Sequence, residues 1–263
     1  MASTPSVPSS LACLPRTRDN WLTDVLGVEC WNVSSPTRQE AHHKGVLIAP
    51  VTGPAFLTAK VEVPHIVAVK RLTQLGFYLV DTALTLQCHP RFAHEVVRDS
   101  STRVPNWEVV DATPRDADSV ASIAAEALTT SRFHLDPKVP RVTASSVKSE
   151  WARSLALGHR GIGCRVVRDA SGVQGFLGIV QGDDGQGSLI IDLIAVRPES
   201  QGRGAGAALV RDFLTRVHGQ GALAQVGTQA ANTTAVRLYE RLGFTLTSAT
   251  YVMHAHVPTE EPS

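Results

Sequence analysis

The chain has 263 residues, with 25 Lys and Arg against 24 Asp and Glu, so its formal net charge is +1. This balance disfavours a nucleic-acid-binding protein, which usually presents a basic face. No apolar run approaches the roughly 20 residues that cross a bilayer, so we expect no membrane association. Four cysteines lie far apart without a CxxC pair, which predicts neither a zinc site nor a disulfide framework; we expect no metal and a reducing, cytoplasmic location.

Composition divides the chain into two blocks between terminal tails. Residues 1–18 are rich in Ser, Pro and Thr and predict a disordered tail, and residues 258–263 predict another. Polar and Pro residues near 98–107 predict a boundary between an N-terminal domain, 19–104, and a second domain, 105–257. In the first domain, 46–48 and 78–80 predict strands, and 66–75 predicts a helix that ends at Gly76.

The second domain has clearer boundaries. Thr113, Pro114 and Asp116 predict the start of a helix that continues over 117–128, followed by a polar loop over 131–140. A further helix over 144–157 stops at Gly158. The pattern then predicts, in order, strands 164–168, 175–181 and 189–196, a helix 204–218, a strand 223–226, a helix 233–242 and a strand 247–254.

A glycine-rich segment links the predicted strand 189–196 to the following helix. Gly202, Gly204 and Gly206 let the backbone approach an anion, and the free N–H groups of a helix start can hold a pyrophosphate, beside the mobile charge of Arg203. The spacing also fits the dinucleotide fingerprint, but five residues separate the strand from the glycines and no acid follows strand 223–226. Besides the pyrophosphate site and the dinucleotide fingerprint, a third interpretation is that these glycines form only a turn and bind no ligand.

Two patterns resemble the GNAT acetyltransferase superfamily. Gln201-x-x-Gly204-x-Gly206 is similar to its acyl-coenzyme A signature, and Asn232, Tyr239 and Gly243-Phe244 follow in the order of its second signature. Together the patterns cover about residues 111–256. The resemblance implies an α/β (α+β) fold with a mixed central sheet flanked by helices, and acetyl-coenzyme A as the acyl donor.

The resemblance also implies roles for individual residues. Main-chain groups of a splayed strand end would hold the pantetheine arm, and the amide of Ala195 or Val196 would polarise the thioester. Tyr239 would protonate the leaving thiolate, since the reference pKa of a phenol is about 10 and that of a thiol about 8.5. The general base stays open between Asp192 and His134. The expected donor-binding residues are Leu193, Ile194, Ala195, Val196, Gln201, Gly202, Arg203, Gly204, Ala205, Gly206 and Asn232.

A narrower resemblance concerns the acceptor. Residues 131–137, then Glu150-Trp151 and Gly158, are similar to the TDP-fucosamine acetyltransferase group, whose members acetylate a nucleotide-linked 4-amino-4,6-dideoxysugar. This implies a small-molecule amine acceptor bound by Arg132, His134 and Trp151, a possible homodimer, and a smaller, partial GNAT-like domain before the catalytic one. Another small amine in a specialised pathway, or a coenzyme A sensor without turnover, remain alternatives.

The first domain also resembles part of the second. Residues 68–77 and 235–244 agree at six of ten positions, five by identity and one as the similar pair Lys70 and Arg237, and they share the helix-Gly-Phe order. The first domain would then be a degenerate copy without the glycine-rich loop; chance similarity between two amphipathic helix ends is the alternative.

Overall fold

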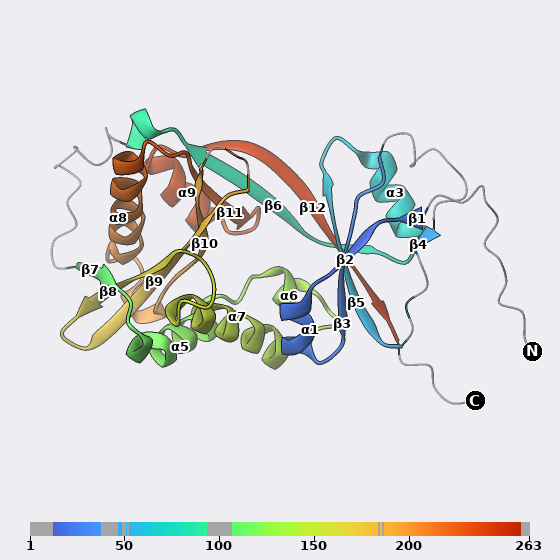
Figure 1. Cartoon of the computed structure of the whole chain (residues 1–263), viewed down its shortest axis with the longest axis horizontal. Helices are drawn as coiled ribbons and strands as arrows, with labels where there is room; N and C mark the ends of the chain where they lie inside the picture. Colours follow the sequence, from blue (N-terminus) through green and yellow to red (C-terminus); the bar gives the residue numbers. More distant parts are fainter. Residues whose placement is uncertain are drawn as a thin grey trace, which may run out of the picture. The chain divides into compact units, whose positions relative to one another are not determined.

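The computed structural model describes residues 13–37, 47–48, 51, 53–93, 107–183, 185 and 187–258 (Figure 1). The chain divides into two compact units: Ala83–Ser248, and Met1–Thr82 together with Ala249–Ser263. The boundary predicted between residues 104 and 105 lies outside the described residues, as do residues 1–12 and 259–263 of the predicted tails. Strands β6 (Tyr78–Cys88) and β12 (Thr245–Val257) each begin in one unit and end in the other.

The unit Ala83–Ser248 is built on a mixed sheet, as the sequence predicts. From one edge, its strands follow the order β6, β11 (Ala224–Gln229), β10 (Leu189–Val196), β9 (Gly172–Gln181), β8 (Gly163–Asp169) and β7 (Glu108–Asp111). The β10–β11 pair runs parallel and the other pairs run antiparallel. In the described residues no helix is both long and apolar enough to cross a membrane.

Helices cover both faces of this sheet (Figure 1). Helices α5 (Ala117–Ala127) and α7 (Arg141–Ala156) pack on one face, in a core that includes Val166, Phe176 and Leu193. Helices α8 (Ala205–Gln220) and α9 (Thr233–Arg241) pack on the other face. The predicted cap before α5 is confirmed: a short 3-10 turn η2 (Pro114–Asp116) precedes it, and the N–H of Thr113 donates to Oδ2 of Asp116 at 2.8 Å.

The second unit has its own hydrophobic core and its own set of paired strands. Strand β3 (Glu29–Val33) pairs with β2 (Arg16–Arg18) and, in parallel, with β5 (Ala55–Glu62), and residues 250–257 of β12 pair antiparallel with β5. This unit also contains helices α1 (Asn20–Leu26) and α3 (Ile66–Gln74). Strand β1 (Cys13–Leu14) pairs in parallel with β4 (Leu47–Ile48). The helix predicted over 66–75 is confirmed, and Gly76 follows it at φ +89°.

The structure differs from the sequence prediction in three places. Residues 13–18, assigned to the tail, hold strands β1 and β2, because Leu14 is buried in the core of this unit. Strand β5 has no predicted counterpart; its first five residues are all buried, so it lacks the alternation that identifies a half-exposed strand. The loop predicted over 131–140 contains a single helical turn, α6 (Arg132–Leu135), since the buried Phe133 draws it into the core.

Candidate active site

Strands β10 and β11 separate partway along their length. Their parallel ladder covers Leu189–Ile191 of β10 and Ala224–Val226 of β11, where it ends. Beyond that point β10 continues to Val196 paired with β9, and β11 continues to Gln229 paired with β6. The resemblance predicts such a splayed strand, and the ends of the pairs confirm it.

A bulge in β10 lies where the two strands separate. The register against β9 shifts between Ile191 and Leu193, so Asp192 is the extra residue. Ile191 belongs to the core beneath α8, whereas Leu193 belongs to the core beneath α5 and α7. A bulge re-aims the side chains that follow it. Asp192 and Leu193 consequently face α7, and Ile194 and Val196 return to the α8 face.

The ladder with β9 decides which amides of β10 face the gap. The N–H of Arg197 donates to the carbonyl of Gln174 at 2.8 Å, and hydrogen-bonded pairs alternate along an antiparallel ladder. Residues 193 and 195 therefore bond to β9, whereas the backbone groups of Ile194 and Val196 point away from it. Of the two amides expected to reach the thioester, Val196 faces the gap and Ala195 does not.

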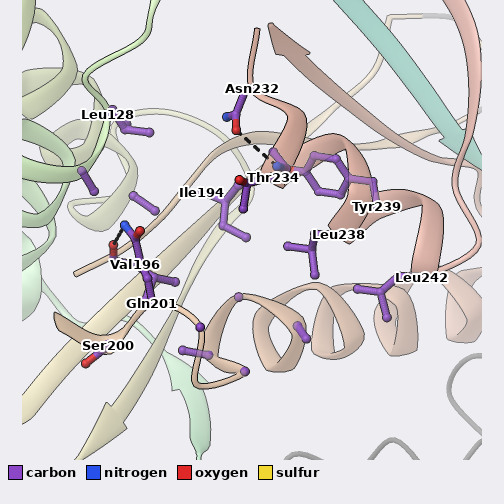
Figure 2. Close-up of a pocket in the computed structure, with 18 of the residues that line it drawn as sticks. Leu128, Ile194, Val196, Ser200, Gln201, Asn232, Thr234, Leu238, Tyr239 and Leu242 are labelled. Carbon is purple, nitrogen blue, oxygen red and sulfur yellow. Dashed lines mark hydrogen bonds between the residues drawn. The ribbon is translucent and has the colours of Figure 1, made fainter. Parts of the chain in front are cut away.

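The glycine-rich segment follows directly. A 3-10 turn η3 (Pro198–Ser200) leads to Gly202 at φ +73° and Gly204 at φ +88°, a region that favours glycine. Gly204 is the N-cap of α8, a helix of 16 residues, whose first N–H groups have no partner within the helix. The side chain of Gln201 donates from Nε2 to the carbonyl of Val196 at 3.0 Å (Figure 2). The backbone is thus arranged as an anion site beside the strand end.

A cavity of about 860 Å³ opens between these elements and α9. Ten predicted site residues line it: Ile194, Ala195, Val196, Gln201, Gly202, Gly204, Ala205, Gly206, Asn232 and Tyr239. The prediction missed the wall from Leu128 to Thr130 and two cationic residues, Arg211 on α8 and Arg241 on α9. Arg211 lies seven residues after Gly204, two helical turns along the same face, and this spacing could have indicated it.

Tyr239 and Asn232 reach the cavity from α9 (Figure 2). Tyr239 is 2% exposed, and its ring lies 5.6 Å from that of Phe244 between centroids. Burial raises the pKa of the Tyr239 phenol well above its ordinary value, so it stays protonated at neutral pH. Asn232 caps the helix, its Oδ1 accepting from the N–H of Ala235 at 3.2 Å.

Two predicted donor-binding residues point elsewhere. Leu193 is buried in the core with α5 and α7. The guanidinium of Arg203 lies over the ring of Trp107, 5.6 Å from its centroid, and the Arg203 carbonyl accepts from Nε1 of Trp107 at 2.8 Å. Neither is among the residues that line the cavity.

The four remaining predicted residues, Arg132, His134, Trp151 and Asp192, lie on the α7 face of β10, outside the cavity lining. Oδ2 of Asp192 accepts from Nε1 of Trp151 at 2.7 Å and from Nε of Arg160 at 2.6 Å, and Oδ1 accepts from Nη2 of Arg160 at 3.0 Å. These three hydrogen bonds occupy both oxygens of the Asp192 carboxylate.

His134 is held by two serines. Its Nδ1 lies 2.7 Å from Oγ of Ser131 and its Nε2 lies 3.3 Å from Oγ of Ser145. Burial lowers the pKa of the His134 imidazole, and the charges of Lys148 and Arg141 lower it further. His134 is therefore neutral at pH 7, the form that can accept a proton.

Sequence analysis missed Lys148, which lies between these residues. It is 8% exposed, and its ammonium lies 4.3 Å from the ring centroid of Trp151 and 6.0 Å from that of Phe133. Burial lowers the pKa of Lys148 to about 7. The sequence holds a signal for it, since Lys148 shares a helical face with Ala144, Trp151 and Leu155, where an apolar residue is expected.

Comparisons with known proteins agree with this geometry. Residues 130–244 match the acetyltransferase (GNAT) family. The spore coat polysaccharide biosynthesis protein SpsD of Bacillus subtilis (strain 168) is 29% identical over 182 residues, which are 69% of this chain and 59% of SpsD. This chain thus spans less than two thirds of that relative.

Solved structures share the fold. A functionally unknown conserved protein from Staphylococcus epidermidis ATCC 12228 matches with a TM-score of 0.57 and 14% identity, over 86% of this chain and 84% of that one. A tandem GNAT protein from the clavulanic acid biosynthesis pathway matches with a TM-score of 0.53 and 14% identity, over 90% and 77%. In the part of the chain that the structure describes, no three His, Cys, Asp or Glu residues are placed to hold a metal. Residues 130–244 are therefore similar in sequence to the acetyltransferase (GNAT) family, and the solved structures share the fold of the chain.

Proposed function

We propose that this protein is an acetyl-coenzyme A-dependent N-acetyltransferase that acts on a primary amine, with a nucleotide-linked 4-amino-4,6-dideoxysugar as its acceptor. One observation carries the proposal: the β10–β11 ladder ends at Ile191 and Val226, and the backbone of Val196 faces the gap beside the glycine-rich turn and Tyr239. A gap of this kind admits an extended acyl thioester between two strands.

The donor fits the chemistry of the cavity. The N–H groups at the start of α8, near Gly202 and Gly204, would hold the pyrophosphate of coenzyme A. Backbone groups of Ile194 would pair with the pantetheine arm, as a neighbouring strand would. Arg211 and Arg241 bring positive charge to the same cavity.

Two groups of the chain would then promote transfer. The N–H of Val196 would donate to the thioester oxygen as charge develops there, and one such donor is worth about 2.7–4 kcal/mol in acyl-transfer enzymes. Tyr239 would donate its proton to sulfur as the C–S bond breaks and the new C–N bond forms. The same burial that raises the pKa of Tyr239 also raises that of a thiol in the cavity, which keeps the two groups matched.

The proton that the amine loses needs a separate acceptor. His134 fits this role better than Asp192, because His134 is neutral at pH 7, whereas Asp192 is engaged by Arg160 and Trp151. We assign Asp192 the role of holding Arg160 and Trp151 in place.

Two findings support a sugar-linked acceptor. Residues 131–137 resemble the group that acetylates nucleotide-linked aminosugars, and they lie on α6 beside α7. The relative SpsD is named for polysaccharide biosynthesis, whose building blocks are nucleotide-linked sugars.

Product analysis tests the proposal. The protein is incubated with acetyl-coenzyme A and a panel of simple amines and nucleotide-linked aminosugars, while thiol release and product mass are recorded. We expect thiol release that depends on the aminosugar, with a product 42 Da heavier, the mass of one added acetyl group. Acetylation of simple amines alone would refute the acceptor, and binding without thiol release for any amine would indicate a sensor.

A further inference from the structure

The α7 face of β10 carries a cluster of charged side chains that acetyl transfer itself does not require. We call Arg132, Lys148, Trp151, Arg160 and Asp192 the α7 cluster. They come from α6, α7, the loop after α7 and the bulge of β10, so the fold brings together residues far apart in the sequence. Three of the five can be cationic, against one carboxylate.

Lys148 stands out within this cluster. In the described part of the chain its ammonium has no hydrogen-bond or ion-pair partner, and two aromatic rings are its close neighbours. Burying an ammonium without such a partner costs free energy, and a cation–π contact offsets only part of that cost. A buried amine left in this state is prepared for a partner that arrives from outside the chain.

The neighbouring charges indicate which partner it would be. Arg132 and Arg160 both disfavour the charged form of Lys148, and Asp192 favours it. His134 on α6 and Arg141 on α7 also interact electrostatically with this cluster, because the charges of Arg141 and Lys148 both lower the pKa of His134. When Lys148 is neutral, the formal charges of Arg132, Arg160 and Asp192 add up to +1. Protonation of Lys148 raises the total charge of the cluster to +2.

We propose that the α7 cluster binds a phosphoryl group of the acceptor and that Lys148 takes up a proton when this anion binds. The proposal rests on the proposed function, because it assigns the anion to the amine that is acetylated. The diphosphate that joins a nucleoside to its sugar carries about −2 over its two phosphoryl groups and matches the protonated cluster, whereas a carboxylate supplies one charge. Planar guanidinium groups such as those of Arg132 and Arg160 pair with phosphate oxygens in bidentate fashion.

The exposure of the cluster allows this approach. The side chain of Arg160 is 40% exposed, and Arg132 is partly exposed, whereas Lys148 is almost fully buried. An anion arriving from solvent would meet the two guanidinium groups first and Lys148 beneath them. Binding would restore the ordinary protonation of Lys148, because a nearby anion stabilises an ammonium.

Calorimetry with inorganic pyrophosphate tests the proposal. The full chain is first saturated with acetyl-coenzyme A, so that the glycine-rich turn is occupied, and pyrophosphate is titrated at pH 7.5 in two buffers of different ionisation enthalpy. We expect the wild type to bind pyrophosphate. On binding, each wild-type chain should take up about half a proton or more in excess of what a Lys148→Met chain takes up. Lys148→Met should bind about tenfold or more weakly, because one charged hydrogen-bond donor is lost.

Two further variants make the experiment decisive. Lys148→Arg keeps the charge at every accessible pH, so it should bind pyrophosphate without the extra proton uptake. Lys138→Met removes an exposed cation close by in the sequence and should match the wild type in both readings. Should Lys148→Met fail to fold, Lys148→Arg and the wild type still decide. Two results would overturn the proposal. One is that the wild type binds pyrophosphate but takes up no more protons than Lys148→Arg does, and the other is that the wild type does not bind pyrophosphate.

The outcome is distinguishable from a failure of the proposed function. Loss of the phosphoryl site would appear as acetylation of simple amines and aminosugars with the same KM, together with undetectable pyrophosphate binding. Failure of acetyl transfer would instead appear as no thiol release for any amine, while pyrophosphate binding and its proton uptake at Lys148 persist.

Discussion

The two faces of strand β10 present different parts of the chain to the ligands that we propose for them. On the α8 face most of the proposed binding groups belong to the backbone. They are the amide of Val196, the left-handed Gly202 and Gly204, and the start of α8. On the α7 face the proposed binding groups are the side chains of the α7 cluster. A backbone site depends on a short stretch of sequence, whereas a side-chain cluster depends on the whole fold. Variants of the two faces should therefore have separable effects.

The largest expected effect is on stability, on the α7 face. The pKa of Lys148 lies near 7 in the folded chain and near 10.5 when unfolded, so between these values the unfolded state binds more protons. Wild-type stability should rise with pH by up to about 1.4 kcal/mol per unit, or about 3.5 kcal/mol in total from pH 7 to 10, relative to Lys148→Met. Urea unfolding at pH 7, 8.5 and 10 measures this difference. Parallel curves for the two proteins would contradict it, and Lys138→Met should retain the wild-type slope.

The next largest effect is on catalysis, on the α8 face. Tyr239→Phe should lower kcat about 100-fold, since it removes the proton donor, and should leave acetyl-coenzyme A affinity nearly unchanged. Because the pKa of Tyr239 is raised, the wild-type rate should not fall up to pH 10 through ionisation of this residue. Steady-state kinetics and donor titration provide both readings, with Tyr251→Phe as the matched control. A kcat equal to that of the wild type would remove Tyr239 from the mechanism.

A smaller effect should follow from one methyl group in the glycine-rich turn. Gly204 is left-handed at φ +88°, and a side chain there costs about 1–2 kcal/mol. Gly204→Ala should weaken acetyl-coenzyme A binding about tenfold, because relief of the strain moves the amides that hold the pyrophosphate. Gly219→Ala is the matched change inside α8, where a Cβ would meet nothing within 4 Å. Equal affinity in the two variants would show that the turn geometry is irrelevant to binding.

The smallest effect concerns the start of α9. Asn232→Ala removes the bond to the N–H of Ala235 and should lower the free energy of unfolding by about 1 kcal/mol. Asn232→Asp, which can still cap the helix, should recover most of this loss. Thermal unfolding of the three proteins measures the difference. A stable Asn232→Ala with weaker donor binding would mean that Asn232 serves the ligand rather than the helix.

Sequence patterns predicted much of the α8 face. Strand β10 has the predicted bounds, and the glycine-rich turn was expected to open a helix at about Gly204. These features are local, because glycine content and helix starts are encoded within a few residues. The choice between Ala195 and Val196 needed the register with β9, which no local pattern contains.

The α7 face was harder to predict. Asp192 was one of two candidate bases, and its pairing with Arg160 depends on a bulge and on a loop 32 residues earlier in the chain. Lys148 reads as a surface residue unless its helical face is considered, and its burial follows from packing against Trp151 and Phe133. Such contacts between distant segments are what single-sequence reasoning lacks.

The pairing of β5 with β12 has a consequence for biosynthesis. Residues 55–62 are translated before the whole unit Ala83–Ser248, yet the strand that pairs with them, residues 250–257, is translated after it. The unit Ala83–Ser248, by contrast, is contiguous in the chain and can complete its ladders while synthesis continues. A nascent polypeptide would therefore carry the edge of β5 unsatisfied until residues 250–257 have been translated, and the unit that contains β5 completes its sheet after the unit Ala83–Ser248.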